Sequence, residues 1–287
     1  STTAQNVPKT VLVTGANGFI GRHLCDSLRD SEITRWDRMD PTGRPIAHHE
    51  LSNPANRKNL RAAVQLADQV YHLAGNADTA AHNEPQVILE DIGAAKEVLD
   101  ACQAERTPLV VVSSAYAKGR NTSYGLTKAL IEDICAGYRS NGLPMSVARL
   151  YNVYGPGQER ANTYQSTVVL NLYRSFSKGD YTLRTPQARR DFVYIDDAVA
   201  ALKLIMEMTV DNQTWLYEIG SGEMVTIAAL SMTMTKLMGY QGHMYMMPYD
   251  SAMQMPYDSA AAPVRPVTVS LEEGLRRTIE HLRGLPK

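Results

Sequence analysis

Short runs of β-branched and apolar residues alternate with longer segments in which apolar residues recur about every 3.6 positions. The runs predict buried strands over residues 10–13, 32–36, 69–74, 109–114 and 145–150. Near-continuous apolar character is typical of parallel strands that helices cover on both faces. The alternation therefore predicts an α/β fold with a doubly wound parallel sheet of the Rossmann type.

The alternation weakens after Leu150. A turn-rich stretch follows, and then the strand-like segment "RRDFVYI" leads into a helix predicted over residues 196–208. We expect a main domain of residues 1–150, to which residues 190–219 return, and a smaller C-terminal lobe of residues 151–189 and 220–287.

Composition and charge narrow the possible partners. A formal net charge of -1 gives no overall positive electrostatic potential that would attract nucleic acid, so we expect no nucleic-acid partner. No run reaches the roughly 18 apolar residues that span a bilayer, and the polar N-terminus does not resemble a signal peptide, so we expect no membrane association. Three widely spaced cysteines are typical of free thiols in a reducing compartment, which favours a cytoplasmic location.

His48, His49 and Glu50 could suggest a metal site. No third ligand at a standard spacing accompanies this cluster, so we expect no metal site.

Three glycines follow the first predicted strand at three-residue intervals, in "TGANGFIG" at 14–21. At a junction of strand, turn and helix, Gly15 would supply a positive φ, Gly18 would let a pyrophosphate approach the backbone, and Gly21 would let helix and strand pack closely. The start of the helix would then hold the phosphates. Tight turns also use glycine for purely structural reasons, so the trio alone leaves both interpretations open.

Asp37 favours the dinucleotide interpretation. It lies just beyond the second predicted strand, where a carboxylate can accept hydrogen bonds from both adenosine ribose hydroxyls and repel a 2′-phosphate. The alternative is a turn aspartate within "WDRMDP". Arg35 and Arg38 could tolerate a 2′-phosphate, but Asp37 favours NAD over NADP.

Tyr124 is the only one of fifteen tyrosines with a lysine four positions later, Lys128. The pair opens a predicted helix, where such residues share a face, and it closely follows Ser113 and Ser114 at a predicted strand end. Ligands bind at the carboxyl ends of parallel strands. A free phenol has a pKa of about 10, so a tyrosine that acts as a base at neutral pH needs about 4 kcal/mol in favour of its phenolate. An adjacent ammonium group and an oxidised nicotinamide could supply much of it.

Taken together, these segments resemble the extended short-chain dehydrogenase/reductases, and within them the NAD-dependent epimerase/dehydratase group that acts on nucleotide sugars. The shared motifs occur in family order over almost the whole chain: TGxxGxxG at 14–21, "HLAG" at 72–75, Ser114, Tyr124-x3-Lys128, "RLYNVYGPGQ" at 149–158, "RDFVYIDDA" at 190–198 and "SLEEGLRRTIEHL" at 270–282.

The resemblance implies the site residues. Ser114, Tyr124 and Lys128 would be catalytic, and Ser114, Asn152 and Arg190 would contact a nucleotide-sugar substrate in the smaller lobe. The residues implied in NAD binding are Gly15, Asn17, Gly18, Phe19, Ile20, Gly21, Asp37, Arg38, Leu51, Leu73, Ala74, Gly75, Asp91, Tyr124 and Lys128. Asp91 stands where the family usually has asparagine, and Glu50 where it usually has an adenine-contacting aspartate. The resemblance also suggests a homodimer through helices around residues 87–105 and 124–139.

The residues after Ser114 bear on the reaction. Sugar 4,6-dehydratases of the family carry an Asp-Glu pair there, but this chain has Ala115 and Tyr116, as in 4-epimerases. We therefore expect an NAD-dependent epimerase acting at C4 through a transient 4-keto intermediate. The alternatives are an NAD(P)H-dependent ketoreductase or dehydratase acting on a sugar nucleotide or a smaller carbonyl substrate, and a catalytically idle NAD-binding sensor or scaffold.

The chain departs from the family over the expected substrate site. Only "RNTS" separates Gly119 from Tyr124, where a loop of a dozen or so residues is usual, and Lys118 stands where a tyrosine is usual. The stretch that normally offers an arginine to a diphosphate contains the hexapeptide "MPYDSA" twice, at 247–252 and 255–260, with Arg265 as its only basic residue. We expect a substrate that is smaller or differently held.

Overall fold

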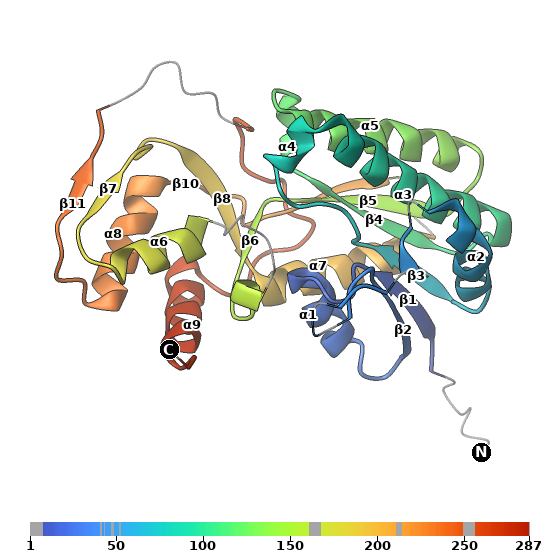
Figure 1. Cartoon of the computed structure of the whole chain (residues 1–287), viewed down its shortest axis with the longest axis horizontal. Coiled ribbons are helices and arrows are strands. Elements are labelled where there is room, and N and C mark those ends of the chain that lie inside the picture. The colour runs from blue at the N-terminus through green and yellow to red at the C-terminus, as the bar shows by residue number, and fades with distance from the viewer. Residues whose placement is uncertain are drawn as a thin grey trace.

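The computed structural model describes residues 8–40, 42, 44–46, 49–51, 53–160, 168–210, 214–248 and 256–286. Its main element is a six-stranded parallel sheet in the order β2-β1-β3-β4-β5-β9 (Figure 1). The strands are β1 (Thr10–Thr14), β2 (Glu32–Trp36), β3 (Gln69–His72), β4 (Leu109–Ser114), β5 (Met145–Leu150) and β9 (Leu216–Ile219). The predicted doubly wound parallel sheet is confirmed.

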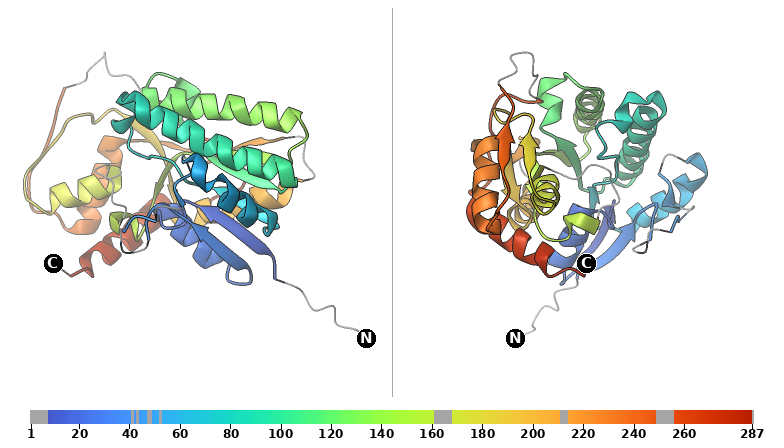
Figure 2. Two further views of the ribbon diagram at one scale, coloured as in Figure 1. Left: turned by 45° about the vertical axis from the view of Figure 1, so that its right-hand side comes forward. Right: turned by 60° about the vertical axis from the view of Figure 1, so that its left-hand side comes forward.

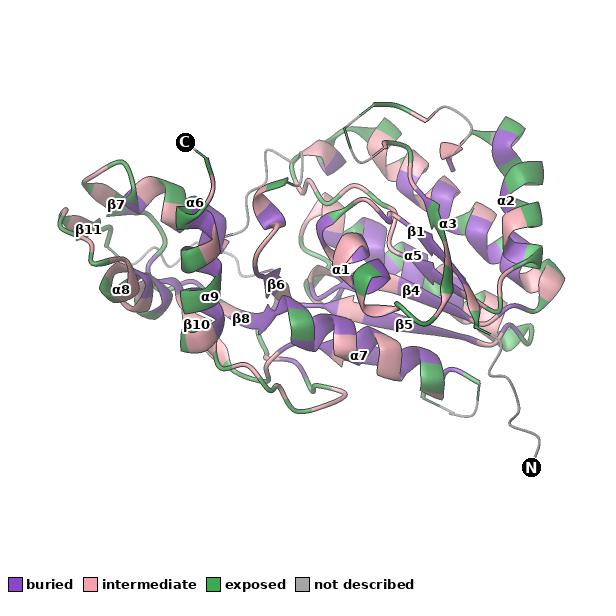
Figure 3. Ribbon diagram, turned by 90° about the horizontal axis from the view of Figure 1, so that it is seen from below, coloured by how far each residue is buried: buried purple, intermediate pink, exposed green. Residues whose placement is uncertain are grey.

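Helices cover both faces of this sheet (Figures 1 and 2). On one face lie α1 (Phe19–Ser27) and α7 (Ile195–Met208), and on the other α2 (Arg57–Gln65), α3 (Pro85–Glu105) and α5 (Ser123–Ser140). The side chains of β1 alternate between the two layers, because Val11 and Val13 belong to one hydrophobic cluster and Leu12 to the other. Figure 3 shows the burial concentrated in the strands and on the helix faces toward them, which explains the apolar runs of the sequence.

A smaller region lies beside the sheet and contains two small sheets, one in the order β10-β8-β6 and one that pairs β11 with β7 (Figure 1). Its elements are β6 (Asn152–Tyr154), α6 (Val168–Phe176), β7 (Tyr181–Leu183), β8 (Arg189–Tyr194), β10 (Met224–Thr226), α8 (Ile227–Met238), β11 (Met244–Met246) and α9 (Leu271–Arg283). Among the described residues, no helix is long and apolar enough to cross a membrane.

Residues 190–219, which were predicted to return to the main sheet, are divided between the two regions. Helix α7 and strand β9 do return, and β9 pairs with β5. Strand β8 instead pairs with β6 on one side and β10 on the other. The edge of β5 that β8 would need is occupied by β9, and β8 is buried between its own two partners.

The arrangement of the strands locates a ligand crevice. The chain passes from β1 to β2 on one side and then to β3 on the other, so the direction of winding reverses between β1 and β3. Open α/β sheets bind ligands at the carboxyl ends of the strands at such a switch point. Gly15 follows β1, and Leu73, Ala74 and Gly75 follow β3, so these predicted residues border the crevice. The three cysteines are buried and free.

Candidate active site

Close main-chain contacts shape the glycine turn after β1. Gly15 has a φ of +68°, and a Cβ there would lie 2.7 Å from the nitrogen of Ala74. A Cβ on Gly21 would lie 2.1 Å from the carbonyl oxygen of Gly15. Only glycine fits at these two positions. Gly18 precedes α1 without a side-chain hydrogen bond that caps the helix, and the helix itself offers no acceptor to its first N–H groups, which begin with Phe19 and Ile20.

Asp37 follows β2 and lies against the glycine turn. Its carboxylate accepts hydrogen bonds from the main-chain N–H groups of Asn17 at 2.9 Å and Met39 at 3.1 Å. Arg38 beside it is exposed. The predicted contact Leu51 differs from these residues, because its side chain is buried in the core with Trp36. The side chains of Phe19 and Ile20 likewise pack in the core, so only their main chain faces the turn.

Ser114 ends β4, and Tyr124 lies in the first turn of α5. The short helix α4 (Tyr116–Gly119) and residues 120–122 connect them. This is the connection that the sequence predicts to be shorter than the usual loop of the family. The two helices meet closely, since a Cβ on Gly125 would lie 2.5 Å from the carbonyl oxygen of Tyr116. Thr122 caps α5 by accepting a hydrogen bond from the N–H of Gly125 at 3.0 Å.

Lys128 lies one helical turn after Tyr124 and is 8% exposed. Its Nζ is 5.6 Å from the centre of the Tyr124 ring. A Cβ on Gly75 would lie only 3.0 Å from this Nζ, so the glycine after β3 leaves the room that the ammonium group occupies. The structure thus brings together the end of β3, the start of α5 and the predicted Tyr-Lys pair.

A buried histidine that the sequence did not single out adjoins this pair. His82 lies in the 3₁₀ turn η3 (Ala81–Asn83) and is fully buried. Its ring packs edge-on against Tyr124, with centres 5.0 Å apart, and its Nε2 lies 3.1 Å from Oδ2 of Asp91. The same Asp91 oxygen is 3.6 Å from Nζ of Lys128. The sequence contains one indication of this contact, because Asp91 stands where the family usually has asparagine.

The predicted substrate residue Asn152 contacts a tyrosine from the C-terminal segment. The hydroxyl of Tyr257 donates to Oδ1 of Asn152 at 2.5 Å, and the guanidinium of Arg190 lies 6.0 Å from the centre of the Tyr257 ring. Burial raises the pKa of Tyr257 well above its usual value, so this hydroxyl is a neutral donor. Tyr257 belongs to the second "MPYDSA" copy, whereas most of the first lies outside the described residues, as does His48.

Lys118 is held by an anionic partner. Its ammonium group lies 2.9 Å from Oε1 of Glu218 on β9 and donates to the hydroxyls of Tyr151 at 2.8 Å and Ser259 at 3.0 Å. Burial tends to raise the pKa of Glu218, but hydrogen bonds from the Ala262 N–H and Lys118 outweigh it and lower that pKa. Lys118 therefore links α4, β9 and the C-terminal segment.

Buried carboxylates fasten the segment that carries Tyr257. Asp191 on β8 accepts hydrogen bonds from the N–H groups of Ser221, Gly222 and Ala261, at 2.6, 3.0 and 3.0 Å. Asp197 on α7 accepts hydrogen bonds from the N–H groups of Thr268 and Val269.

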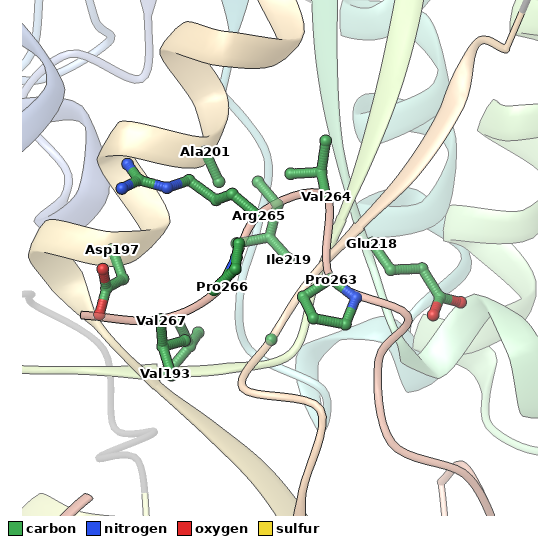
Figure 4. A pocket seen from close by; sticks show the side chains of 11 residues that line it. Val193, Asp197, Ala201, Glu218, Ile219, Pro263, Val264, Arg265, Pro266 and Val267 are labelled. Atoms are coloured by element: carbon green, nitrogen blue, oxygen red, sulfur yellow. The ribbon is translucent and has the colours of Figure 1, made fainter. Parts of the chain in front are cut away.

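The stretch between these two attachments lies against β9 and α7 around a cavity of only about 10 Å³ (Figure 4). Such a volume has room for about one water molecule. The side chain of Arg265 extends from this stretch toward α7 (Figure 4).

The residues that follow β1, β2 and β3 fit a dinucleotide. The bare glycine turn and the uncapped start of α1 offer N–H groups to a pyrophosphate. Asp37 presents a carboxylate just after the end of β2. In dinucleotide-binding folds of this type, an acidic residue at this place binds the ribose hydroxyls. The ammonium group of Lys128 lies next to Gly75, which follows β3.

Comparisons with known proteins agree with this fit. The model of the NAD dependent epimerase/dehydratase family matches residues 11–220. The chain is 24% identical, over 96% of its length and 98% of the relative's, to UDP-N-acetyl-alpha-D-glucosaminuronate decarboxylase of Bacillus cytotoxicus.

Two solved structures share the fold. UDP-glucose 4-epimerase of Thermus thermophilus, in complex with NAD, is 25% identical with a TM-score of 0.77, over 96% of this chain and 100% of that one. UDP-N-acetylglucosamine 4-epimerase of Methanobrevibacter ruminantium, in complex with UDP-N-acetylmuramic acid, is 22% identical with a TM-score of 0.82, over 96% of this chain and 98% of that one.

Proposed function

The chain belongs to the NAD-dependent epimerase/dehydratase family, and on that premise we propose that it binds NAD and inverts C4 of a nucleotide sugar through a transient 4-keto intermediate. The observation that carries the proposal is the placement of Tyr124 and Lys128 at the crevice, with the ammonium group against Gly75. Lys128 is buried, whereas Tyr124 keeps part of its surface exposed.

Tyr124 and Ser114 act on the C4 oxygen. The Tyr124 oxygen, as phenolate, accepts the proton of the C4 hydroxyl, and the Ser114 hydroxyl donates a hydrogen bond to the same oxygen. Lys128 favours the phenolate through its positive charge. Bound NAD supplies the acceptor for the C4 hydride and the donor that returns it. After the sugar has turned over, Tyr124 returns the proton to the C4 oxygen.

The surroundings of Tyr124 favour epimerisation over dehydration. Ala115 and Tyr116 stand at the two positions where the dehydratases have the Asp-Glu pair. The ring of Tyr116 packs edge-on against those of Tyr124 and Tyr257, with ring centres 5.5 and 6.2 Å apart. The carboxylic acid and carboxylate that the Asp-Glu pair would provide for the loss of water are therefore missing at positions 115 and 116. Return of hydride to the opposite face of one ketone requires no such pair.

We assign NAD to the main domain and the substrate to the smaller lobe, where Asn152 and Arg190 lie beside Tyr257. In this assignment Tyr257 is part of the substrate wall, and a nucleotide sugar with a diphosphate is the class that Arg190 suits. We also retain a cytoplasmic location and a homodimer through α3 and α5 as proposals. The exposed Leu89, Leu126 and Leu130 on these helices support the dimer, which light scattering tests.

A second candidate is the decarboxylation of a nucleotide uronic acid. The decarboxylase relative, which covers nearly the whole chain, favours it. Such a reaction also starts with oxidation at C4, so Tyr124 keeps its role. Release of CO₂ from a uronate, with no C4 epimer formed from a neutral hexose, would identify this activity instead. A ketoreductase would consume its reduced cofactor stoichiometrically.

The test is C4 epimerisation of UDP-hexoses, followed by NMR, in the wild type and in Tyr124→Phe. The variant keeps the ring and its packing, so we expect unchanged folding and NAD binding but a turnover lowered by a factor of roughly 10²–10⁴. Lys128→Met should also lower turnover and should raise the pH at which the remaining rate develops, because the charge that favours phenolate is gone. Full activity in Tyr124→Phe would contradict the mechanism.

A further inference from the structure

The His82–Asp91 pair is unusual because both imidazole nitrogens face hydrogen-bond acceptors. Nδ1 lies 2.8 Å from the main-chain oxygen of Asp78, which can only accept, so Nδ1 carries a hydrogen. Nε2 lies 3.1 Å from Oδ2 of Asp91. Without a proton between these two atoms, the lone pair of Nε2 would face a carboxylate oxygen in a fully buried position.

A single proton between Nε2 and Oδ2 removes this conflict. With the proton on Nε2 the pair is an imidazolium and a carboxylate, and with the proton on Oδ2 it is a neutral imidazole and a carboxylic acid. Its net charge is zero in both forms. Asp91 also accepts from the N–H of Asn76 at 2.9 Å, which holds the carboxyl group in place.

We propose that His82 and Asp91 share this proton and act together as positioning residues, so that the charge of Lys128 stays available to Tyr124. If the proton were absent, Asp91 would be a full negative charge 3.6 Å from Nζ of Lys128 and would offset its effect. The inference rests on the proposed role of Tyr124 for its catalytic meaning, but the charge coupling itself is independent of that role.

The other titratable groups around the pair are few within the described residues. Tyr124 and Lys128 face it from α5. The carboxylate of Asp78 accepts from the N–H groups of Ala80 and Ala81. His72 on β3 is within electrostatic reach of Asp91 and Lys128; burial, and then the charge of Lys128, lowers its pKa to about 4, so it is neutral at working pH.

The experiment follows the ionisation of Tyr124 in the whole protein, without substrate. Near-ultraviolet absorbance of tyrosinate is titrated for each variant and for the same variant carrying Tyr124→Phe, and the difference isolates Tyr124. His82→Gln places an amide donor near the Nε2 position but holds no titratable proton. We expect Tyr124 to ionise at a higher pH in His82→Gln than in the wild type, because Asp91 then keeps its negative charge.

A second substitution and a control test the cause of the shift. Adding Asp91→Asn to His82→Gln should return the ionisation of Tyr124 to the wild-type pH, because the uncompensated charge is gone. His72→Asn, which removes a buried but neutral imidazole near the same lysine, should cause no shift. Thermal unfolding confirms that each variant is folded, and His82→Asn replaces His82→Gln if the latter is not.

An unchanged ionisation of Tyr124 in His82→Gln would overturn the inference and would indicate an ion pair between Asp91 and Lys128 beside a neutral His82. A shift that persists in His82→Gln/Asp91→Asn would also overturn it, since structural disturbance would then be the cause. Neither result bears on the proposed function, which fails separately if Tyr124→Phe retains full turnover.

Discussion

The glycine turn after β1 and the segment over residues 256–269 both contact predicted site residues, but they are built differently. The turn is fixed by neighbours in one strand-turn-helix unit, through main-chain contacts that exclude any side chain at Gly15 and Gly21. The segment has no helix or strand of its own and is fastened by Asp191 and Asp197, which lie more than sixty positions earlier in the chain. The proposed cofactor side therefore depends on local backbone geometry, and the proposed substrate side on buried carboxylates with distant partners.

The largest expected effect comes from breaking the distant attachment. Asp191→Asn turns one carboxylate oxygen into an amide donor that faces N–H groups, so we expect a loss of roughly 3–5 kcal/mol of stability. Urea unfolding measures it. Asp196→Asn, at an exposed carboxylate five positions later, is the matched control and should change stability by less than about 0.5 kcal/mol. Equal effects of the two substitutions would contradict the fastening role.

Acid should lower the free energy of unfolding through His72, which lies at the end of β3. Its pKa is lowered to about 4 in the folded protein, mainly by burial, against about 6.5 when unfolded. The neutral imidazole therefore contributes stability in full above pH 6.5, and that contribution is lost as the pH falls toward 4, by about 3 kcal/mol. The unfolding free energy of the wild type should fall more steeply over this range than that of His72→Asn. Parallel pH profiles would show that His72 does not carry the effect.

Asp37→Ala should give the smallest of these effects, and it should be measurable in cofactor binding. Removing the carboxylate leaves the Asn17 N–H without its acceptor and removes the proposed ribose contact. We expect NAD binding to weaken by about 1–3 kcal/mol, with a smaller change for NADP, as measured by calorimetric titration. Arg38→Ala, at the exposed neighbour, should weaken NAD binding less. A preference for NADP in the wild type would invalidate the assignment of Asp37.

The same contrast explains what the sequence could predict. The proposed roles of Gly15, Asp37, Tyr124 and Lys128 are tied to short spacings and strand ends, so their places in the fold followed from local pattern. The cofactor contact of Asp91 stays a prediction, and the sequence did not predict that its two oxygens also face Asn76 and His82.

The substrate side was less predictable for a physical reason. The two "MPYDSA" copies are identical in sequence, so only the tertiary packing shows that Tyr257 donates to Asn152. Strand β8 was expected in the main sheet because a buried apolar run does not specify which strand it pairs with.

In the proposed reaction, hydride leaves C4 and returns to the same carbon within one active site. The most direct measurement is conversion of a UDP-hexose labelled with deuterium at C4, followed by mass spectrometry and NMR of the product. We predict a C4 epimer that retains the deuterium at C4 without net consumption of NAD. A product whose C4 deuterium has been replaced by hydrogen from solvent would contradict the claim.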